Sequence, residues 1–204
     1  MEKYEIKKLK DIEYSTWQGG KTYEIAIGGG NKDYKNRDFL WRVSSATCDL
    51  EESEFSDLTN YSRFLTTLDK PIKLEHFSAI SKEKISDITL EPFMVHNFDG
   101  EIRTVSHGKC KDFNLMTKKL DAFGSMIVEN KNNGGLIILD ESEHRKFGLK
   151  VKQVVFIASG GILIRETNQE LNEEDFFVSN GEIININATK DNSNIIICTI
   201  IIAK

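Results

Sequence analysis

Alternation of apolar and polar residues, the pattern of a half-buried β-strand, recurs along this chain. Its clearest instance is residues 38–46, D-F-L-W-R-V-S-S-A, which contain no Gly or Pro. A strand here sends alternate side chains to opposite faces. One predicted face carries Phe39, Trp41, Val43 and Ser45, and the other carries Leu40, Arg42, Ser44 and Ala46. The second face is either half of a polar pocket or an ordinary solvated surface.

Short β-rich runs fill most of the remaining sequence. Clusters of Gly, Asn, Asp and Ser separate them, and the pairs Asp99-Gly100 and Asn180-Gly181 are strong hairpin signals. Few windows show a 3.6-residue apolar period. The chain has 14 glycines and only two prolines. The sequence therefore predicts a mainly β protein.

The two halves of the chain share a rhythm of strands and turns, which predicts two tandem β-sandwich or jelly-roll units over residues 1–118 and 119–204. Each half ends in a closing strand, at 112–117 and 195–202. The first strand carries Asp112 and Asn114, whereas the second is almost wholly apolar. We expect the first unit to hold the polar pocket and the second to be structural.

Composition narrows the classes of function. The chain has 204 residues and a net charge of −5, with acidic and basic residues interspersed, so we expect neither nucleic acid nor a membrane surface as partner. Cys48, Cys110 and Cys198 are too scattered for a disulfide scaffold and favour a reducing compartment. No long apolar segment resembles a signal peptide or membrane span. The expected location is the cytoplasm.

A candidate pocket follows from the polar faces of three predicted strands. Asp112, Asn114 and Met116 share one face of their strand. This face points either into the mouth of a barrel, where it could bind a ligand, or to solvent. Arg42 and Arg63 are their natural partners: each arginine either pairs internally with a carboxylate or binds an anionic ligand. The remaining candidates are Glu24 as an internal partner, Gln18, Thr22 and Ser44 for neutral hydrogen bonds, and Trp17 and Trp41 as walls or core packing.

Metal and nucleophile motifs are absent from the sequence. The four histidines, His76, His96, His107 and His144, are isolated and form no H-x-H pair, so we expect surface or rim positions and no metal centre. No G-x-S-x-G occurs. General acid–base work by Glu24 or Asp112 stays open, since burial raises the pKa of a carboxyl group.

The order of several short motifs resembles the HutD/Ves family over residues 14–117. These motifs are W-Q-G-G at 17–20 with Thr22 and Glu24, D-F at 38–39, W-R at 41–42 with Ser44 and Ala46, F-S at 55–56 with Arg63, E-P-F at 91–93, F-D-G at 98–100 and D-F-N-L-M-T at 112–117. The resemblance implies a two-unit cupin fold, or bicupin. It also implies a link to histidine utilisation, with regulation through binding of a pathway intermediate.

Two functional hypotheses remain, beside a purely structural or interaction role. The first is a bicupin without metal or cofactor that binds a small polar or anionic metabolite and senses or regulates through it, with a homodimer left open. The second is a metal-independent isomerase or hydrolase that uses Glu24 or Asp112 as general acid or base. The predicted ligand-binding residues are Trp17, Gln18, Thr22, Glu24, Trp41, Arg42, Ser44, Arg63, Asp112, Asn114 and Met116.

Overall fold

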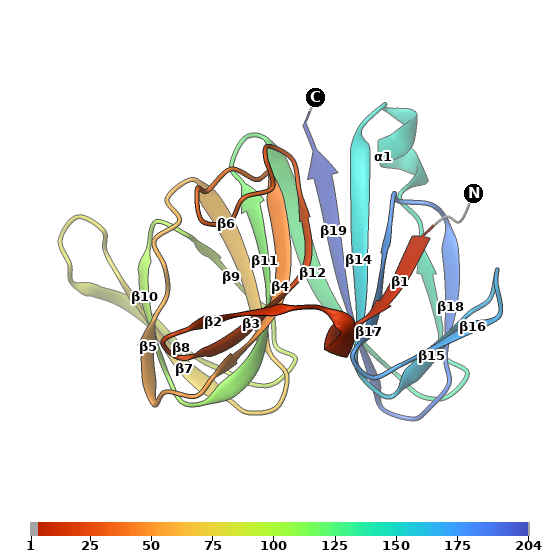
Figure 1. Cartoon of the computed structure of the whole chain (residues 1–204), viewed down its shortest axis with the longest axis horizontal. Coiled ribbons are helices and arrows are strands. Elements are labelled where there is room, and N and C mark those ends of the chain that lie inside the picture. The colour runs from red at the N-terminus through yellow and green to blue at the C-terminus, as the bar shows by residue number, and fades with distance from the viewer. Residues whose placement is uncertain (1–3, 204) are drawn as a thin grey trace. The chain divides into compact units, whose positions relative to one another are not determined.

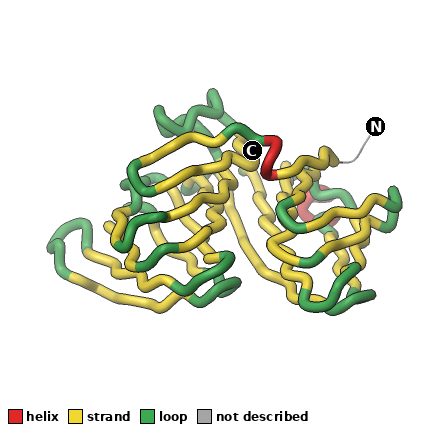
Figure 2. Tube along the Cα trace, turned by 60° about the horizontal axis from the view of Figure 1, so that its bottom comes forward, coloured by secondary structure: helices red, strands yellow, loops and turns green. Residues whose placement is uncertain are grey.

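A computed structural model describes residues 4–203, which form 19 strands, one α-helix and one 3-10 helix (Figure 1). All strands in its four sheets pair in antiparallel fashion with their neighbours. Figure 2 shows how little helix there is: the red segments are short, and strand and loop alternate along the trace. The predicted mainly β class is confirmed. No helix in the described range is long and apolar enough to span a membrane.

The chain divides into two compact units, and Glu13–Leu120 forms one of them. Its first sheet has six strands in the order β2-β3-β4-β11-β6-β9 and its second has four in the order β5-β10-β7-β8. The six-stranded sheet comprises β2 Tyr14–Trp17, β3 Gly20–Gly28, β4 Trp41–Cys48, β11 Cys110–Lys118, β6 Tyr61–Thr67 and β9 His96–Asp99. The four-stranded sheet comprises β5 Glu52–Glu54, β10 Arg103–His107, β7 Ile72–Phe77 and β8 Lys84–Leu90.

Apolar side chains from both sheets of this unit form a common core. Leu65 of β6, Leu74 of β7 and Leu90 of β8 are fully buried in it, and Phe98 and the facing pair Cys48 and Cys110 are nearly so. Burial on this scale is the main stabilising term in a β-sandwich.

The other unit comprises residues 121–203 and the described part of Met1–Ile12. Its sheets have the orders β1-β17-β14-β19-β12 and β13-β18-β15-β16. The strands are β1 Tyr4–Lys8, β12 Ala122–Lys131, β13 Leu136–Leu139, β14 Lys150–Ser159, β15 Gly161–Ile164, β16 Gln169–Asn172, β17 Asp175–Ser179, β18 Ile184–Ala188 and β19 Ser193–Ile202, with η1 at Leu9–Asp11 and α1 at Ser142–Lys146. Its core is rich in Ile, Val and Leu from both sheets.

The unit boundaries differ from the predicted division at residue 118. Strand β1 pairs with β17, in the register Tyr4 opposite Ser179, so the start of the chain belongs to the later unit. The Tyr4 ring packs 5.3 Å from the Phe177 ring, centre to centre, in that unit's core. Sequence rhythm could not reveal this, because a strand's partner lies far away along the chain.

Strand β4, the strand predicted over residues 38–46, starts at Trp41 and lies between β3 and β11. Its alternation is the expected one. In β3, however, a bulge at Ile25 interrupts the register: Glu24 pairs with Ser44, whereas Ala26 pairs with Val43. The extra residue reverses the predicted faces beyond it, so that Ile27 instead of Ala26 lies on the side of Arg42.

Candidate functional site

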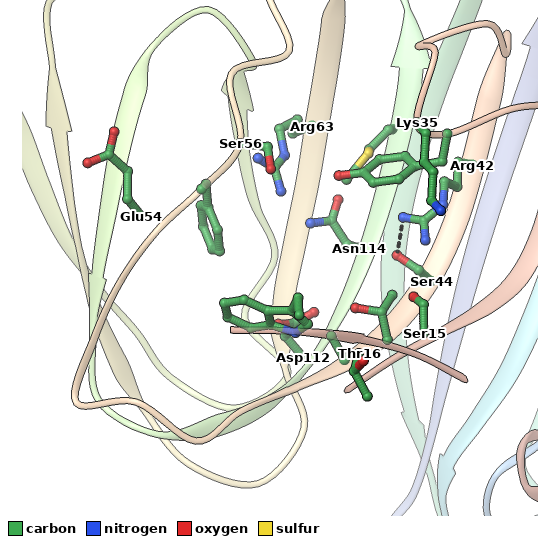
Figure 3. A pocket seen from close by; sticks show the side chains of 16 residues that line it. Ser15, Thr16, Lys35, Arg42, Ser44, Glu54, Ser56, Arg63, Asp112 and Asn114 are labelled. Carbon is green, nitrogen blue, oxygen red and sulfur yellow. Dashed lines mark hydrogen bonds between the residues drawn. The ribbon is translucent and has the colours of Figure 1, made fainter. Parts of the chain in front are cut away.

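A cavity of about 300 Å³ opens on the inner face of the six-stranded sheet in the Glu13–Leu120 unit (Figure 3). Eight of the predicted binding residues line it: Trp17, Thr22, Arg42, Ser44, Arg63, Asp112, Asn114 and Met116. The polar face of β11 therefore points into a cavity and not into bulk solvent. Its volume is at the lower end of the range for small-molecule sites.

Strand register builds the floor of this cavity, because paired residues in adjacent antiparallel strands face the same side. Met116 of β11 pairs with Arg42 of β4 on one side and with Arg63 of β6 on the other. Two residues earlier on β11, Asn114 pairs with Ser44, and two residues earlier again, Asp112 pairs with Ala46. The two guanidinium groups thus lie at one end of the floor and the Asp112 carboxyl at the other, with the Asn114 amide between them (Figure 3).

Arg42 is held by the protein itself. Its Nε donates to Glu24 Oε2 at 2.8 Å and its Nη1 donates to Ser44 Oγ at 3.0 Å. The Tyr34 ring covers the guanidinium, with its centre 4.2 Å from Cζ. This ion pair confirms the expected internal arginine–carboxylate pair and largely neutralises the charge of Arg42.

Arg63 has no corresponding partner. Its residue is 4% exposed, yet the described part of the protein offers no acceptor to its guanidinium, and Nε is fully buried without a hydrogen bond. The guanidinium lies on two aromatic rings, 4.7 Å from the centre of Phe55 and 5.2 Å from that of Phe98. Burial lowers the pKa of Arg63 to about 10, so the side chain still carries its charge at neutral pH. An unpaired buried cation is an expensive feature to retain.

Asp112 and Asn114 complete the set of unpaired polar groups. No ion pair to the Asp112 carboxyl forms within the described residues, and its burial raises the pKa to about 7 even though Arg63 and Arg42 oppose that shift. The Asn114 Oδ1 atom is buried and accepts no hydrogen bond. Arg63, Asn114 and Asp112 thus present a cation, an amide and an acid that can form hydrogen bonds with a bound molecule.

Aromatic walls and a polar rim enclose this floor. Trp17 folds over Gly19, so closely that a Cβ atom at residue 19 would lie 2.3 Å from the indole carbons Cη2 and Cζ3. The lining residues that the pocket prediction missed are Ser15, Thr16, Tyr34, Lys35, Ala46, Glu54, Phe55 and Ser56. Ala46 stands on the predicted polar face and Phe55-Ser56 in a family motif, whereas Tyr34 and Lys35 come from an irregular loop that carries no periodic signal.

Three predicted residues lie away from this cavity. Trp41 is buried and packs against Gly28, where a Cβ would lie 2.4 Å from the indole Nε1, so it is a packing residue and not a pocket wall. Gln18 is exposed in the turn between β2 and β3. Glu24 lies in an adjoining open depression that also contains Arg42 and Thr22.

One of the four histidines, His76, lies in surroundings that differ from the predicted surface or rim position. His76 is buried, not at the surface, and its Nε2 lies 2.9 Å from His96 Nε2. Thr104 Oγ1 donates to the Ile102 carbonyl at 3.1 Å, so it accepts the proton of His76 Nδ1 at 2.9 Å. His96 Nε2 is then the donor to His76. Within residues 4–203 no group of three or more metal-binding side chains is found. The three cysteines are buried and free.

A family model and several solved structures are similar to this chain over nearly its whole length. The family model described as HutD matches residues 9–196. The structure of HutD from Pseudomonas fluorescens SBW25, in a formate condition, is 17% identical with a TM-score of 0.71, and the match covers 96% of this chain and 97% of that one. The conserved protein of unknown function PA5104 from Pseudomonas aeruginosa PAO1 is 19% identical with a TM-score of 0.74, covering 98% and 99%.

A more distant structural match is the bacterial pirin YhhW from Escherichia coli, in complex with nickel(II). It is 9% identical with a TM-score of 0.61, and the match covers 96% of this chain and 98% of that one. No curated protein matches the chain by sequence. At these identities the structures show the fold alone, and the fold is the predicted bicupin.

Proposed function

Given that this chain belongs to the HutD family, we propose that its Glu13–Leu120 unit binds a small anionic metabolite through Arg63. The observation that carries this proposal is a charged guanidinium buried at a cavity with no acceptor among the described residues. Leaving such a group unsatisfied costs on the order of several kcal/mol. A carboxylate matches its planar, forked geometry.

The surroundings of Arg63 favour a small ligand with an apolar or planar body. Trp17, Tyr34 and Phe55 line the cavity, and rings of this kind cover planar molecules well. The cavity volume of about 300 Å³ suits a molecule of roughly ten non-hydrogen atoms. Urocanate, a planar intermediate of histidine degradation with a single carboxylate, meets these requirements, and formylglutamate from the same class of intermediates supplies a carboxylate without the planar body. In the proposed role the protein senses such an intermediate and regulates through it.

A binding screen tests this function. Thermal shift and calorimetry with urocanate, formylglutamate and formate should show stabilisation that depends on ligand concentration. Arg63→Met should abolish it, because Met keeps the volume of the side chain but removes its charge. Arg165→Gln, at an exposed arginine in the other unit, is the matched control and should bind as the natural protein does. Failure of every anion to bind, or equal binding by Arg63→Met, would refute the proposal.

An acid–base enzyme is the second candidate, favoured by the pKa of about 7 at Asp112. A carboxyl that titrates near neutral pH can both donate and accept a proton under physiological conditions. Turnover of a bound anion that disappears in Asp112→Asn, with binding retained, would support isomerase or hydrolase chemistry. Glu24, the other candidate for general acid or base, already forms an ion pair with Arg42.

A further inference from the structure

We propose that Asp112 holds the anionic ligand as a neutral carboxylic acid, so that ligand binding takes up a proton from solution. This inference rests on the proposed function and adds a condition to it: the affinity of the site depends on pH. Asp112 shares the cavity with the charged side chains of Arg42 and Arg63, and its carboxyl has no ion pair among the described residues.

The charges around Asp112 can be counted. Arg42 and Glu24 cancel each other through their ion pair at 2.8 Å, which leaves Arg63 and Asp112 as the remaining charged groups of the floor. Glu54 at the rim is paired with Arg103 at 2.7 Å, and Lys35 is exposed. The other titratable groups near Asp112 are Tyr34 in the lining and the facing thiols of Cys110, two residues before Asp112 on β11, and Cys48.

Two charge states of the floor follow. With Asp112 ionised, its charge cancels that of Arg63 and the floor is neutral. With Asp112 protonated, the floor carries a net charge of about one unit, provided by Arg63. An anion is attracted only in the second state, because in the first it would add a second negative charge to a buried site. Protonation of Asp112 and anion binding therefore favour each other.

Burial favours the protonated form of Asp112. The carboxyl lines the cavity with no ion pair among the described residues, and its loss of hydration raises the pKa by more than the positive charges of Arg63 and Arg42 lower it. A neutral acid at this end of the floor can donate a hydrogen bond to the ligand, which an ionised carboxylate cannot do.

Formate and propionate are suitable probes, since simple carboxylates stay ionised above about pH 5. Their dissociation constants should be measured by calorimetry from about pH 5.5 to pH 8.5. The expected result is an affinity that is constant below about pH 7 and falls up to tenfold per pH unit above it. Calorimetry in buffers of different ionisation enthalpy should give an uptake of up to about one proton per anion bound near pH 8. Asp112→Asn should bind both probes with an affinity independent of pH.

Carbon NMR of the aspartate carboxyl carbons adds a measurement on the unaltered protein. The Asp112 resonance, assigned by its loss in Asp112→Asn, should titrate near neutral pH and move to higher pH when formate saturates the site. Binding with the same affinity at every pH, or an Asp112 titration that formate leaves unmoved, would overturn the inference while the proposed function stands. Failure of both probes to bind at any pH, together with the larger acids of the binding screen, would refute both.

Discussion

Arg42 donates from Nε to Glu24 Oε2 at 2.8 Å, across the strand pair β3–β4. Arg63, which pairs with Met116 from the other side, has no such carboxylate. The Arg42–Glu24 pair thus decides which of the two buried arginines is available to an anion. It also explains why a cavity containing two cations is not strongly positive.

Glu24→Gln should release the charge of Arg42 into the cavity. Arg42 would keep its hydrogen bond to Ser44 but lose its ionic partner, so the free energy of unfolding should fall by about 1 kcal/mol, a modest value because Glu24 is 39% exposed. Anion affinity should rise, since the floor gains a positive charge. Urea unfolding and formate titration measure the two effects, with Glu13→Gln, at the rim of the adjoining depression, as a control. Weaker formate binding in Glu24→Gln would contradict this account.

Arg63→Met should remove anion binding without lowering stability. The natural side chain is buried without hydrogen bonds, and its contacts with Phe55 and Phe98 are also available to a thioether. Replacement of buried charge by an apolar group of similar size is often neutral or stabilising, so the free energy of unfolding should stay the same or rise by about 1 kcal/mol. Chemical denaturation without ligand measures this. A loss of more than about 2 kcal/mol would indicate that Arg63 is a structural residue.

Asp112→Asn should stabilise the protein at neutral and alkaline pH. Because burial raises the pKa of Asp112 to about 7 in the folded state, the folded protein binds a proton between about pH 4 and pH 7 that the unfolded chain has lost. Stability therefore falls as the pH rises through that window, by up to about 1.4 kcal/mol per unit. The variant lacks this loss, so its advantage in melting temperature should grow from pH 4 to pH 7 and then level off. A pH-independent difference between the two proteins would contradict the assignment.

The His76–His96 pair should make the protein sensitive to acid. Burial lowers the pKa of both imidazoles, and each also lies within 5.4 Å of the Phe98 ring, centre to centre. Their neutral forms are thus favoured in the folded state, so stability is complete above about pH 6.5 and declines as the pH falls below it.

The double variant His76→Leu, His96→Leu tests this prediction by urea unfolding at about pH 5 and pH 7.5. It should lose less stability between these two values than the natural protein does. His144→Gln in the other unit serves as a control for histidine replacement in general. An identical loss in the natural protein and the double variant would exclude the pair as the acid-sensitive element.

Gly19→Ala should disturb the Trp17 wall of the cavity. The added methyl group would lie 2.3 Å from two indole carbons of the partly exposed Trp17, so the indole would have to shift. We expect a change in tryptophan fluorescence and a several-fold weaker binding of urocanate, with the fold retained. Trp17→Phe identifies the responsible indole, since the chain has only two tryptophans. Unchanged urocanate affinity in Gly19→Ala would show that the Trp17 wall does not contribute to binding.

The local pattern of the sequence determined the β class, the strand at 38–46 and the polar face of β11, because the two-residue period of a strand is visible in any short window. It also grouped Arg42 with Ser44 on one strand face and Asp112 with Asn114 on another, and it left open whether these faces point into a pocket or to solvent.

Only the tertiary structure decided which strands become neighbours. Pairing of β11 with both β4 and β6 sets Arg42 and Arg63 on either side of Met116, and pairing of β1 with β17 moves the first strand into the later unit. The bulge at Ile25 and the meeting of His76 with His96 are likewise set by partners far apart in sequence. Such contacts depend on the register and packing of whole sheets, which no short window of sequence contains. The sequence therefore supplied the groups of the site, and the fold selected Arg63 as the one left without a partner among the described residues.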